Sequence, residues 1–231
     1  MKNILITFCA LMIVASGVAQ RIPEKEKKKP GGFEKKFIWG FSLNQYWSTI
    51  QGNPLPRDYF AKPSSGILVS AEYYPLTFLG LGIGAGYQQR GAGILHHNIP
   101  AVNPDTTYRE RLRFNTVEFP VSVTLRTPKN IVRGLRWSGS MAVVPMINLQ
   151  SRDVLNVQEP SIHDTDVVQD VSALYFKNDT AYQFTFGPEI DCGTGIFKIH
   201  FAYSKGSANV YKSGQGNGHN QTMGFRLSAM F

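Results

Sequence analysis

The stretch GLGIGAGYQQRG, residues 80–91, carries glycine at every second position from 80 to 86. A phosphate-binding loop of the GxGxxG kind needs a strand, a tight turn and then a helix, with a different glycine spacing. Here apolar side chains share one face and the glycines share the other; the apolar residues are Leu81, Ile83, Ala85 and Tyr87. This period of two residues predicts a β-strand. Glycine leaves space on its face, and we expect that space to take long Arg and Lys side chains.

The same alternation recurs along the rest of the chain and predicts eight strands in total. The other seven are 36–47, 66–75, 111–127, 134–149, 180–191, 196–204 and 221–231. In the segment 111–127, Leu112 and Phe114 are out of phase with the apolar residues that follow. Because an extra residue reverses the faces of a strand, we expect a bulge near Asn115–Thr116.

The connections between these segments alternate in length. Those around 76–79, 128–133 and 192–195 are short, whereas 48–65, 92–110, 150–179 and 205–220 are long and polar. Outer-membrane barrels have an even number of strands, short turns at one end, long loops at the other, an apolar outside and a polar inside. The pattern therefore predicts an all-β, eight-stranded antiparallel up-and-down transmembrane β-barrel over 37–231, in the cell outer membrane.

The N-terminal residues have a different character. Residues 1–19 have a basic start, an apolar run and small residues at the end, which indicates a secretory signal peptide rather than a membrane anchor. Removal of this segment leaves Cys192 as the only cysteine, so no intrachain disulfide can form. Residues 20–36 are basic and hold much of the net charge of +8, which predicts a disordered periplasmic tail. An exported chain is not expected to bind nucleic acid.

The barrel hypothesis places polar residues in the lumen and aromatic residues at the membrane interfaces. The expected lumen cluster is Glu72, Arg90, Glu118, Arg136, Glu189, Asp191, Lys198 and Arg226. Because a barrel of eight strands is only wide enough for side chains, we interpret this cluster as a paired structural plug, with a gated ion path as the alternative. The expected interfacial girdles are Trp39, Trp47, Tyr73, Tyr87, Trp137, Tyr182 and Tyr203.

The chain ends on an alternating strand with Phe225, Leu227 and a terminal Phe231. This ending resembles the signal read by the outer-membrane barrel assembly machinery. The region 37–231 also resembles the PorT-type small outer-membrane barrels, which share the fold of the OmpA-type transmembrane domain. The resemblance rests on GLGIGAGYQQRG and on TVEFPVSVTLR, residues 116–126. The resemblance implies the barrel fold and a location in the outer membrane. One member of that family assists a protein-secretion system. Both termini are expected in the periplasm.

The sequence predicts no catalytic, cofactor-binding or metal site. The loop residues His96, His97, Asp105, His163, Asp164, Asp166 and His219 lack metal-ligand spacing. His200 and Ser204 stand about 13 Å apart along a strand, too far for a nucleophile and its base. We therefore predict a non-enzymatic barrel in outer-membrane lipid. It would bind an envelope partner through 150–179 or the tail 21–36, and a small channel or a lipid-acting enzyme is the alternative.

Overall fold

A computed structural model of the chain describes residues 36–53, 58–95, 107–127, 134–159, 162–212 and 216–231. Most of these residues lie in strands. The long strands are β1 (Phe37–Gly52), β3 (Lys62–Leu76), β4 (Leu79–Leu95), β5 (Thr107–Glu118), β7 (Leu135–Glu159), β9 (Asn178–Asp191), β10 (Ile196–Gly206) and β11 (Gly218–Met230). The shorter elements are β2 (Asp58–Phe60), β6 (Val121–Arg126), β8 (Ile162–Asp170) and the 3-10 helix η2 (Ser172–Leu174). Within the described ranges, no helix is long and apolar enough to cross a membrane.

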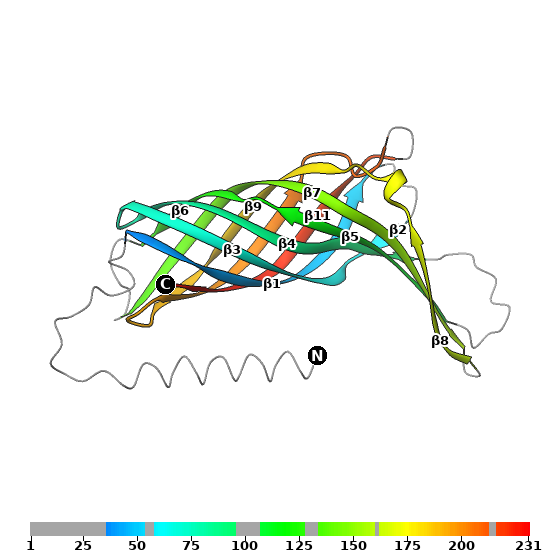
Figure 1. Ribbon diagram of the computed structural model, residues 1–231, viewed down its shortest axis with the longest axis horizontal. Helices are drawn as coiled ribbons and strands as arrows, with labels where there is room; N and C mark the ends of the chain where they lie inside the picture. The colour runs from blue at the N-terminus through cyan, green and yellow to red at the C-terminus, as the bar shows by residue number, and fades with distance from the viewer. Residues whose placement is uncertain (1–35, 54–57, 96–106, 128–133, 160–161, 213–215) are drawn as a thin grey trace.

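The strands form one closed antiparallel ring (Figure 1). Each wall strand pairs with its neighbours in the chain, and β5 and β6 together make one wall strand between β4 and β7. The ring closes where β1 pairs with β11, from Gly40↔Met230 to Gly52↔Gly218. Eight wall positions result, so the predicted eight-stranded up-and-down barrel is confirmed.

The two ends of the barrel differ. One end, which we call the turn end, carries the short β3–β4 and β9–β10 turns together with residue 37 and the C-terminus (Figure 1). The opposite loop end carries β2, β8, η2 and the β10–β11 connection. At the turn end, Phe231 and Trp39 exchange backbone hydrogen bonds of 2.7 and 3.1 Å. The predicted signal peptide and tail lie outside the described residues, apart from Lys36.

Side chains alternate strictly between the lumen and the exterior. On β1, exposed and buried residues follow one another from Phe37 to Trp47. The outward residues form an apolar surface around the ring. Of the predicted girdle residues, Trp39, Tyr73 and Trp137 are exposed near the turn end, and Trp47, Tyr87 and Tyr182 are exposed nearer the loop end. Tyr203 is half-buried. An apolar belt between two aromatic rings is the surface that a bilayer requires.

The bulge between β5 and β7 lies on a different strand from the one expected. The register between β5 and β7 does shift at Asn115–Thr116, but the extra residue is Leu149 on β7, which stands between the partners Asn148 and Gln150. The β5 strand keeps its phase, so Leu112 and Phe114 point into the lumen and are buried. They do so because the loop end of the lumen is apolar rather than polar.

The segment 150–179 is also different from the predicted polar loop. The β7 strand continues to Glu159, returns as β8, and pairs with it from Arg152↔Asp170 onward. Figure 1 shows this β7–β8 hairpin extending away from the barrel at the loop end. In this extension β7 is paired on both sides, with β5 and with β8, whereas β8 has a strand on one side only.

The glycines of β4 have a different role from the one expected. A Cβ added at Gly80 would lie 2.6 Å from the Tyr74 ring, and one at Gly82 would lie 2.5 Å from Ser122 Oγ. At Gly86 the nearest side-chain atom belongs to Leu68. The space is therefore filled by the neighbouring strands and by an aromatic ring, and not by Arg or Lys.

Candidate functional site

The carboxylate of Glu189 is the centre of an ion-pair cluster in the turn-end half of the lumen. It is fully buried, pairs with Arg126, and lies 3.2 Å from the Lys198 ammonium. The Ser138 hydroxyl donates to it at 2.7 Å. The predicted lumen cluster does not include Arg126. The alternation of side chains along β5 and β6 places Arg126 on the same face as Glu118, so the sequence pattern could have predicted it.

Glu72 completes this turn-end cluster. Lys198 Nζ donates to its two oxygens at 2.8 and 2.7 Å, and the Tyr74 hydroxyl donates to it at 2.5 Å. The Arg126 guanidinium lies 3.9 Å from the centroid of the Tyr74 ring. Two carboxylates therefore face two cations, so the cluster is formally neutral and each buried charge has a partner, as burial demands.

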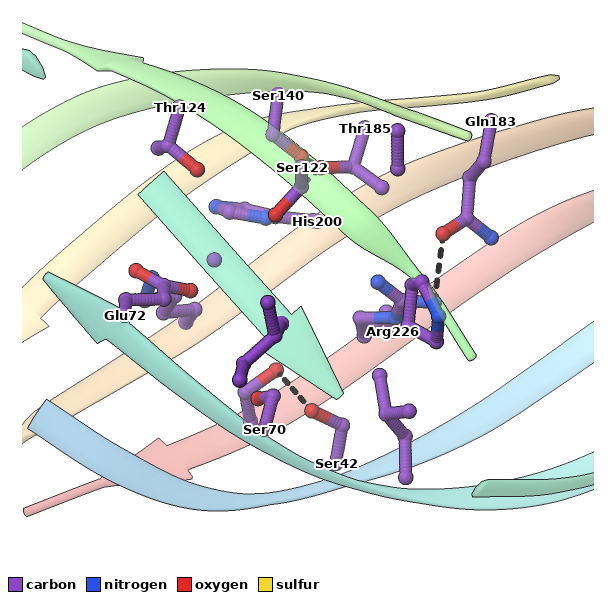
Figure 2. A pocket seen from close by; sticks show the side chains of 17 residues that line it. Ser42, Ser70, Glu72, Ser122, Thr124, Ser140, Gln183, Thr185, His200 and Arg226 are labelled. Atoms are coloured by element: carbon purple, nitrogen blue, oxygen red, sulfur yellow. Dashed lines mark hydrogen bonds and ion pairs between the residues drawn. The ribbon is translucent and has the colours of Figure 1, made fainter. Parts of the chain in front are cut away.

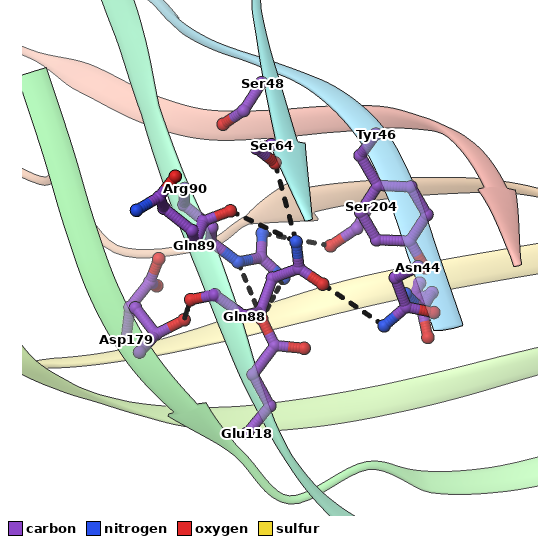
Figure 3. Close-up of polar contacts among 12 residues, drawn as sticks. Asn44, Tyr46, Ser48, Ser64, Gln88, Gln89, Arg90, Glu118, Asp179 and Ser204 are labelled. Carbon is purple, nitrogen blue, oxygen red and sulfur yellow. Dashed lines mark hydrogen bonds and ion pairs between the residues drawn. The ribbon is translucent and has the colours of Figure 1, made fainter. Parts of the chain in front are cut away.

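A second cluster fills the middle of the lumen (Figure 3). Arg90 is fully buried and pairs with Glu118 at 2.7 Å. Its Nη1 also reaches Ser204 Oγ at 3.5 Å. Next to it, the Gln88 amide accepts from Asn44 at 3.1 Å and donates to Ser64 at 3.5 Å. This layer joins β1, β3, β4, β5 and β10 through side chains as well as through the ring.

The remaining predicted lumen residues are Arg226, Asp191 and Arg136. Arg226 donates to Asn44, Tyr46 and Gln183 at 3.0, 3.2 and 3.0 Å, all of which are neutral. Asp191 accepts the backbone N–H of Gly193 at 2.8 Å in the β9–β10 turn. Arg136 is half-buried on β7 beside Glu189 in the strand register. The structure thus groups Glu72, Glu189 and Lys198 in one cluster and Arg90 with Glu118 in another.

A small polar cavity lies beside the turn-end cluster, and Glu72 and Lys198 are among its lining. It has a volume of about 40 Å³, and hydroxyl groups of Ser42, Ser122 and Thr185 are among its lining (Figure 2). Since one water molecule needs roughly 10–15 Å³ in this measure, the cavity has room for about three. It is a hydration pocket in size, and a substrate would not fit.

Apolar side chains cover both ends of this polar interior. At the turn end, Ile38, Tyr74, Ile196 and Met230 pack together. At the loop end a larger cluster contains Ile50, Ala92, Ile94, Leu112, Phe114, Val171, Tyr175, Val210 and Tyr211, with Tyr59 against it. The last of these is tied to the cluster by a 2.7 Å hydrogen bond between the Tyr211 and Tyr59 hydroxyls. The described side chains therefore enclose the polar layers from both sides.

The lumen contains one arrangement that resembles part of a hydrolase site. His200 Nε2 lies 2.9 Å from Ser138 Oγ, rather than near Ser204. Because the Ser138 hydroxyl donates its proton to Glu189, His200 must donate to Ser138 and cannot accept its proton. Ser138 is also 2% exposed. The arrangement therefore works as a structural hydrogen bond and not as a nucleophile with its base.

The loop histidines give no metal centre in the described part of the chain. His219 Nδ1 donates to the Ala208 carbonyl at 3.0 Å. His96, His97 and Asp105 lie outside the described residues, as do the side chains of His163, Asp164 and Asp166. Among the described residues, no three His, Cys, Asp or Glu side chains are grouped as metal ligands.

The closed ring, the apolar exterior and the polar lumen define the architecture. The fold is that of a small outer-membrane β-barrel. No protein-family model matches the chain, and no curated protein matches it in sequence.

The solved structures that are similar in fold include the following three. Neisserial surface protein A (NspA) has a TM-score of 0.43 and 8% identity, over 88% of this chain and 100% of that one. Ail of Yersinia pestis, in complex with the heparin analogue sucrose octasulfate, has a TM-score of 0.38 and 9% identity, over 85% of this chain and 100% of that one. The N-terminal β-barrel domain of Pseudomonas aeruginosa OprF has a TM-score of 0.35 and 12% identity, over 87% of this chain and 100% of that one.

Proposed function

We propose that the protein is a non-enzymatic accessory barrel of the outer membrane, which binds an envelope partner through the β7–β8 hairpin. The observation that carries this proposal is that the lumen is filled by side chains while a long hairpin extends away from the barrel. A filled lumen gives the interior a structural role, which moves any function to the outside.

The exterior supports a position across a bilayer. Trp39 and Trp47 are eight residues apart on β1, about 27 Å along a strand. A strand tilt of about 40° reduces this to roughly 20 Å along the barrel axis, near the height of an outer-membrane apolar belt. With a signal peptide at residues 1–19, the turn end and both termini face the periplasm, and the hairpin faces outward.

The hairpin offers a binding edge. Of the described strands, β8 pairs with β7 alone, so its other edge has no strand beside it. Val167 and Val168 are each 54% exposed on this strand. An exposed edge strand of this kind can bind an extended segment of another protein, which adds to the sheet as a further strand. The resemblance to PorT-type barrels supports an accessory role of this kind, with protein secretion as one setting; the tail 21–36 is the second contact candidate.

The test is to shorten the hairpin and keep the ring of wall strands. Since Arg152 and Asp170 are paired partners, residues 153–169 can be replaced by an Asn-Gly turn, which fits a two-residue hairpin. The first part of β5, up to Leu112, loses its β7 partners in this variant and keeps its pairing with β4. We expect the shortened protein to migrate as a folded barrel before boiling and to lose the partner that co-purifies with the wild type in mild detergent. A matched variant with Val167→Ser and Val168→Ser should weaken the same partner.

Two outcomes would count against the proposal. One is a partner that stays bound to the shortened protein but is lost on removal of residues 21–36. The other is stepwise ion conductance of the purified barrel in a planar bilayer, which would favour a channel.

A further inference from the structure

The outward face of the wall carries a row of arginines at the loop end. The β5 strand has arginine at every second position, 109, 111 and 113. Of these, Arg111 is exposed and Arg113 is half-buried, while Leu112 between them is buried in the lumen. On the neighbouring strand β7, Arg152 is exposed and stands directly opposite Arg113 in the register. The two strands therefore place Arg111, Arg113 and Arg152 on one face, and we call these three residues the arginine row.

A buried lysine adds to the charge of the arginine row. Lys62, the first residue of β3, is only 4% exposed. Its ammonium group lies near enough to Arg113 and Arg111 for both guanidinium groups to repel it. Opposite these two arginines, the intervening strand β4 has Gly91 and Gly93, so it adds no side chain at those positions. The lysine and the arginine row thus form one cationic group that joins β3, β5 and β7.

The described carboxylates do not balance these charges. Among the residues that the structure describes, none forms an ion pair with Lys62 or with the arginine row. The register places the exposed Asp170 opposite Arg152, at the edge of the row. Like charges directly opposite on neighbouring strands are destabilising, and so is a buried ammonium group without a partner. An anion bound from outside the chain would remove both penalties.

The arginine row lies near the height of the lipid head groups. Tyr87, a girdle residue nearer the loop end, is paired with Val117 on β5. Arg113 is four residues beyond Val117, about 13 Å along a strand, or roughly 10 Å along the barrel axis at a tilt of about 40°. The head-group layer adds roughly 5–8 Å to each side of the hydrocarbon, and a long arginine side chain can bend back toward it. The row is therefore within reach of head-group phosphates.

We propose that the arginine row and Lys62 bind a phosphate group of lipopolysaccharide in the outer leaflet. The inference rests on the placement of the barrel under the proposed function, in which the loop end faces outward. A guanidinium group donates two parallel hydrogen bonds to phosphate oxygens, which makes arginine well suited to this ligand. The outward face of the wall is turned toward lipid, which favours a lipid phosphate over a soluble anion. The bound phosphate neutralises the repulsion between β5 and β7 at the base of the β7–β8 hairpin.

The test uses the full mature chain, refolded in detergent without lipopolysaccharide. Fluorescently labelled lipopolysaccharide is titrated with the protein while the anisotropy of the label is recorded. We expect saturable binding, and at least about tenfold weaker binding for the double variant Arg111→Gln with Arg113→Gln. Lipopolysaccharide whose phosphates have been removed enzymatically should bind the wild type equally weakly. The matched control is Lys205→Gln with Lys212→Gln, which removes two exposed cations outside the row and should bind as the wild type does.

The melting temperature gives a second measurement, which a purely structural role would not change in the same way. In the absence of lipopolysaccharide, Lys62→Met should melt at a higher temperature than the wild type, because the variant removes a buried charge that has no ion-pair partner among the described residues. Lipopolysaccharide should then raise the melting temperature of the wild type and raise that of Lys62→Met much less.

Three results would overturn the proposal. They are equal binding of intact and phosphate-free lipopolysaccharide, unchanged binding by the Arg111 and Arg113 variant, and displacement of the lipid by inorganic phosphate at the same concentration. If the double variant does not fold, Arg113→Gln takes its place in the titration. Phosphate-dependent binding without a hairpin-dependent partner would refute only the hairpin function. A hairpin-dependent partner without phosphate-dependent binding would refute only the lipid site.

Discussion

Replacement of Glu189 by Gln is the most direct probe of the filled lumen. The substitution keeps the shape of the side chain and removes its charge. Glu189 is fully buried and contacts Arg126, Lys198 and Ser138, so the variant leaves two cations facing the single carboxylate of Glu72. Breaking a buried ion pair in this way costs about 3–5 kcal/mol. That is a large share of the roughly 5–15 kcal/mol by which a domain is stable.

The assay is equilibrium unfolding in urea, with the barrel in lipid vesicles and tryptophan fluorescence as the signal. Glu72→Gln serves as the comparison within the same cluster, because the Glu72 side chain is 15% exposed and, among the described residues, has an ion pair with Lys198 only. It should lose about 1–3 kcal/mol. The double variant Glu189→Gln with Arg126→Met restores formal neutrality and keeps the Lys198–Glu72 pair, so it should be more stable than Glu189→Gln by about 1 kcal/mol or more.

A Glu189→Gln protein within about 0.5 kcal/mol of the wild type would refute this reasoning. Such a result would mean that water reaches the cluster freely and screens its charges, and the lumen would then be a hydrated path. The planar-bilayer experiment on the same variant would show whether that path conducts.

Three further predictions concern the turn end. Gly80→Ala should lose about 1–3 kcal/mol, because the new Cβ would lie 2.6 Å from the packed Tyr74 ring. Burial and the charge of Asp191 raise the pKa of the Cys192 thiol, so less thiolate is present at a given pH. Alkylation of Cys192 should therefore be slower than alkylation of a free thiol and should accelerate as the pH rises. It should also be faster in Asp191→Asn. Deletion of Phe231 should reduce the fraction of folded, heat-modifiable barrel in outer membranes without a change in synthesis.

Matched substitutions check these three predictions. Gly139→Ala should be almost neutral, because the nearest atoms to its Cβ lie 3.5 Å away. Thiol reactivity independent of residue 191 would contradict the role of the carboxylate. Phe201→Ala removes a similarly exposed aromatic side chain from β10, and an equal assembly defect in that variant would show that the C-terminal position of Phe231 has no special role.

Alternation alone was enough to find the wall of the barrel. Eight apolar faces were visible in the sequence because lipid demands apolar side chains at every outward position of a wall strand. Two features escaped that pattern. The β7–β8 hairpin projects from the lipid belt, so its residues had no reason to alternate. Leu112 and Phe114 face an apolar part of the lumen, which inverts the rule of a polar inside.

The side-chain partners depended on register, which the pattern does not contain. Glu189 and Asp191 are both on β9 near the same end, yet one is the centre of an ion cluster and the other closes a turn. Which carboxylate meets Lys198 depends on the stagger of β9 against β10, where Lys198 is opposite Glu189. The sequence gives the faces of each strand, but a one-residue slip would exchange every partner.

The pairing of β1 with β11 joins the first and last strands of the chain. Among the described wall strands, every other pairing joins strands that follow one another along the wall, so only this seam joins the two ends of the barrel sequence. Until the final strand is present, both margins of the sheet have unpaired backbone groups, which a hydrocarbon phase does not tolerate. We therefore expect insertion to follow complete synthesis, and a chain that stops within β11 to fail to form a stable barrel.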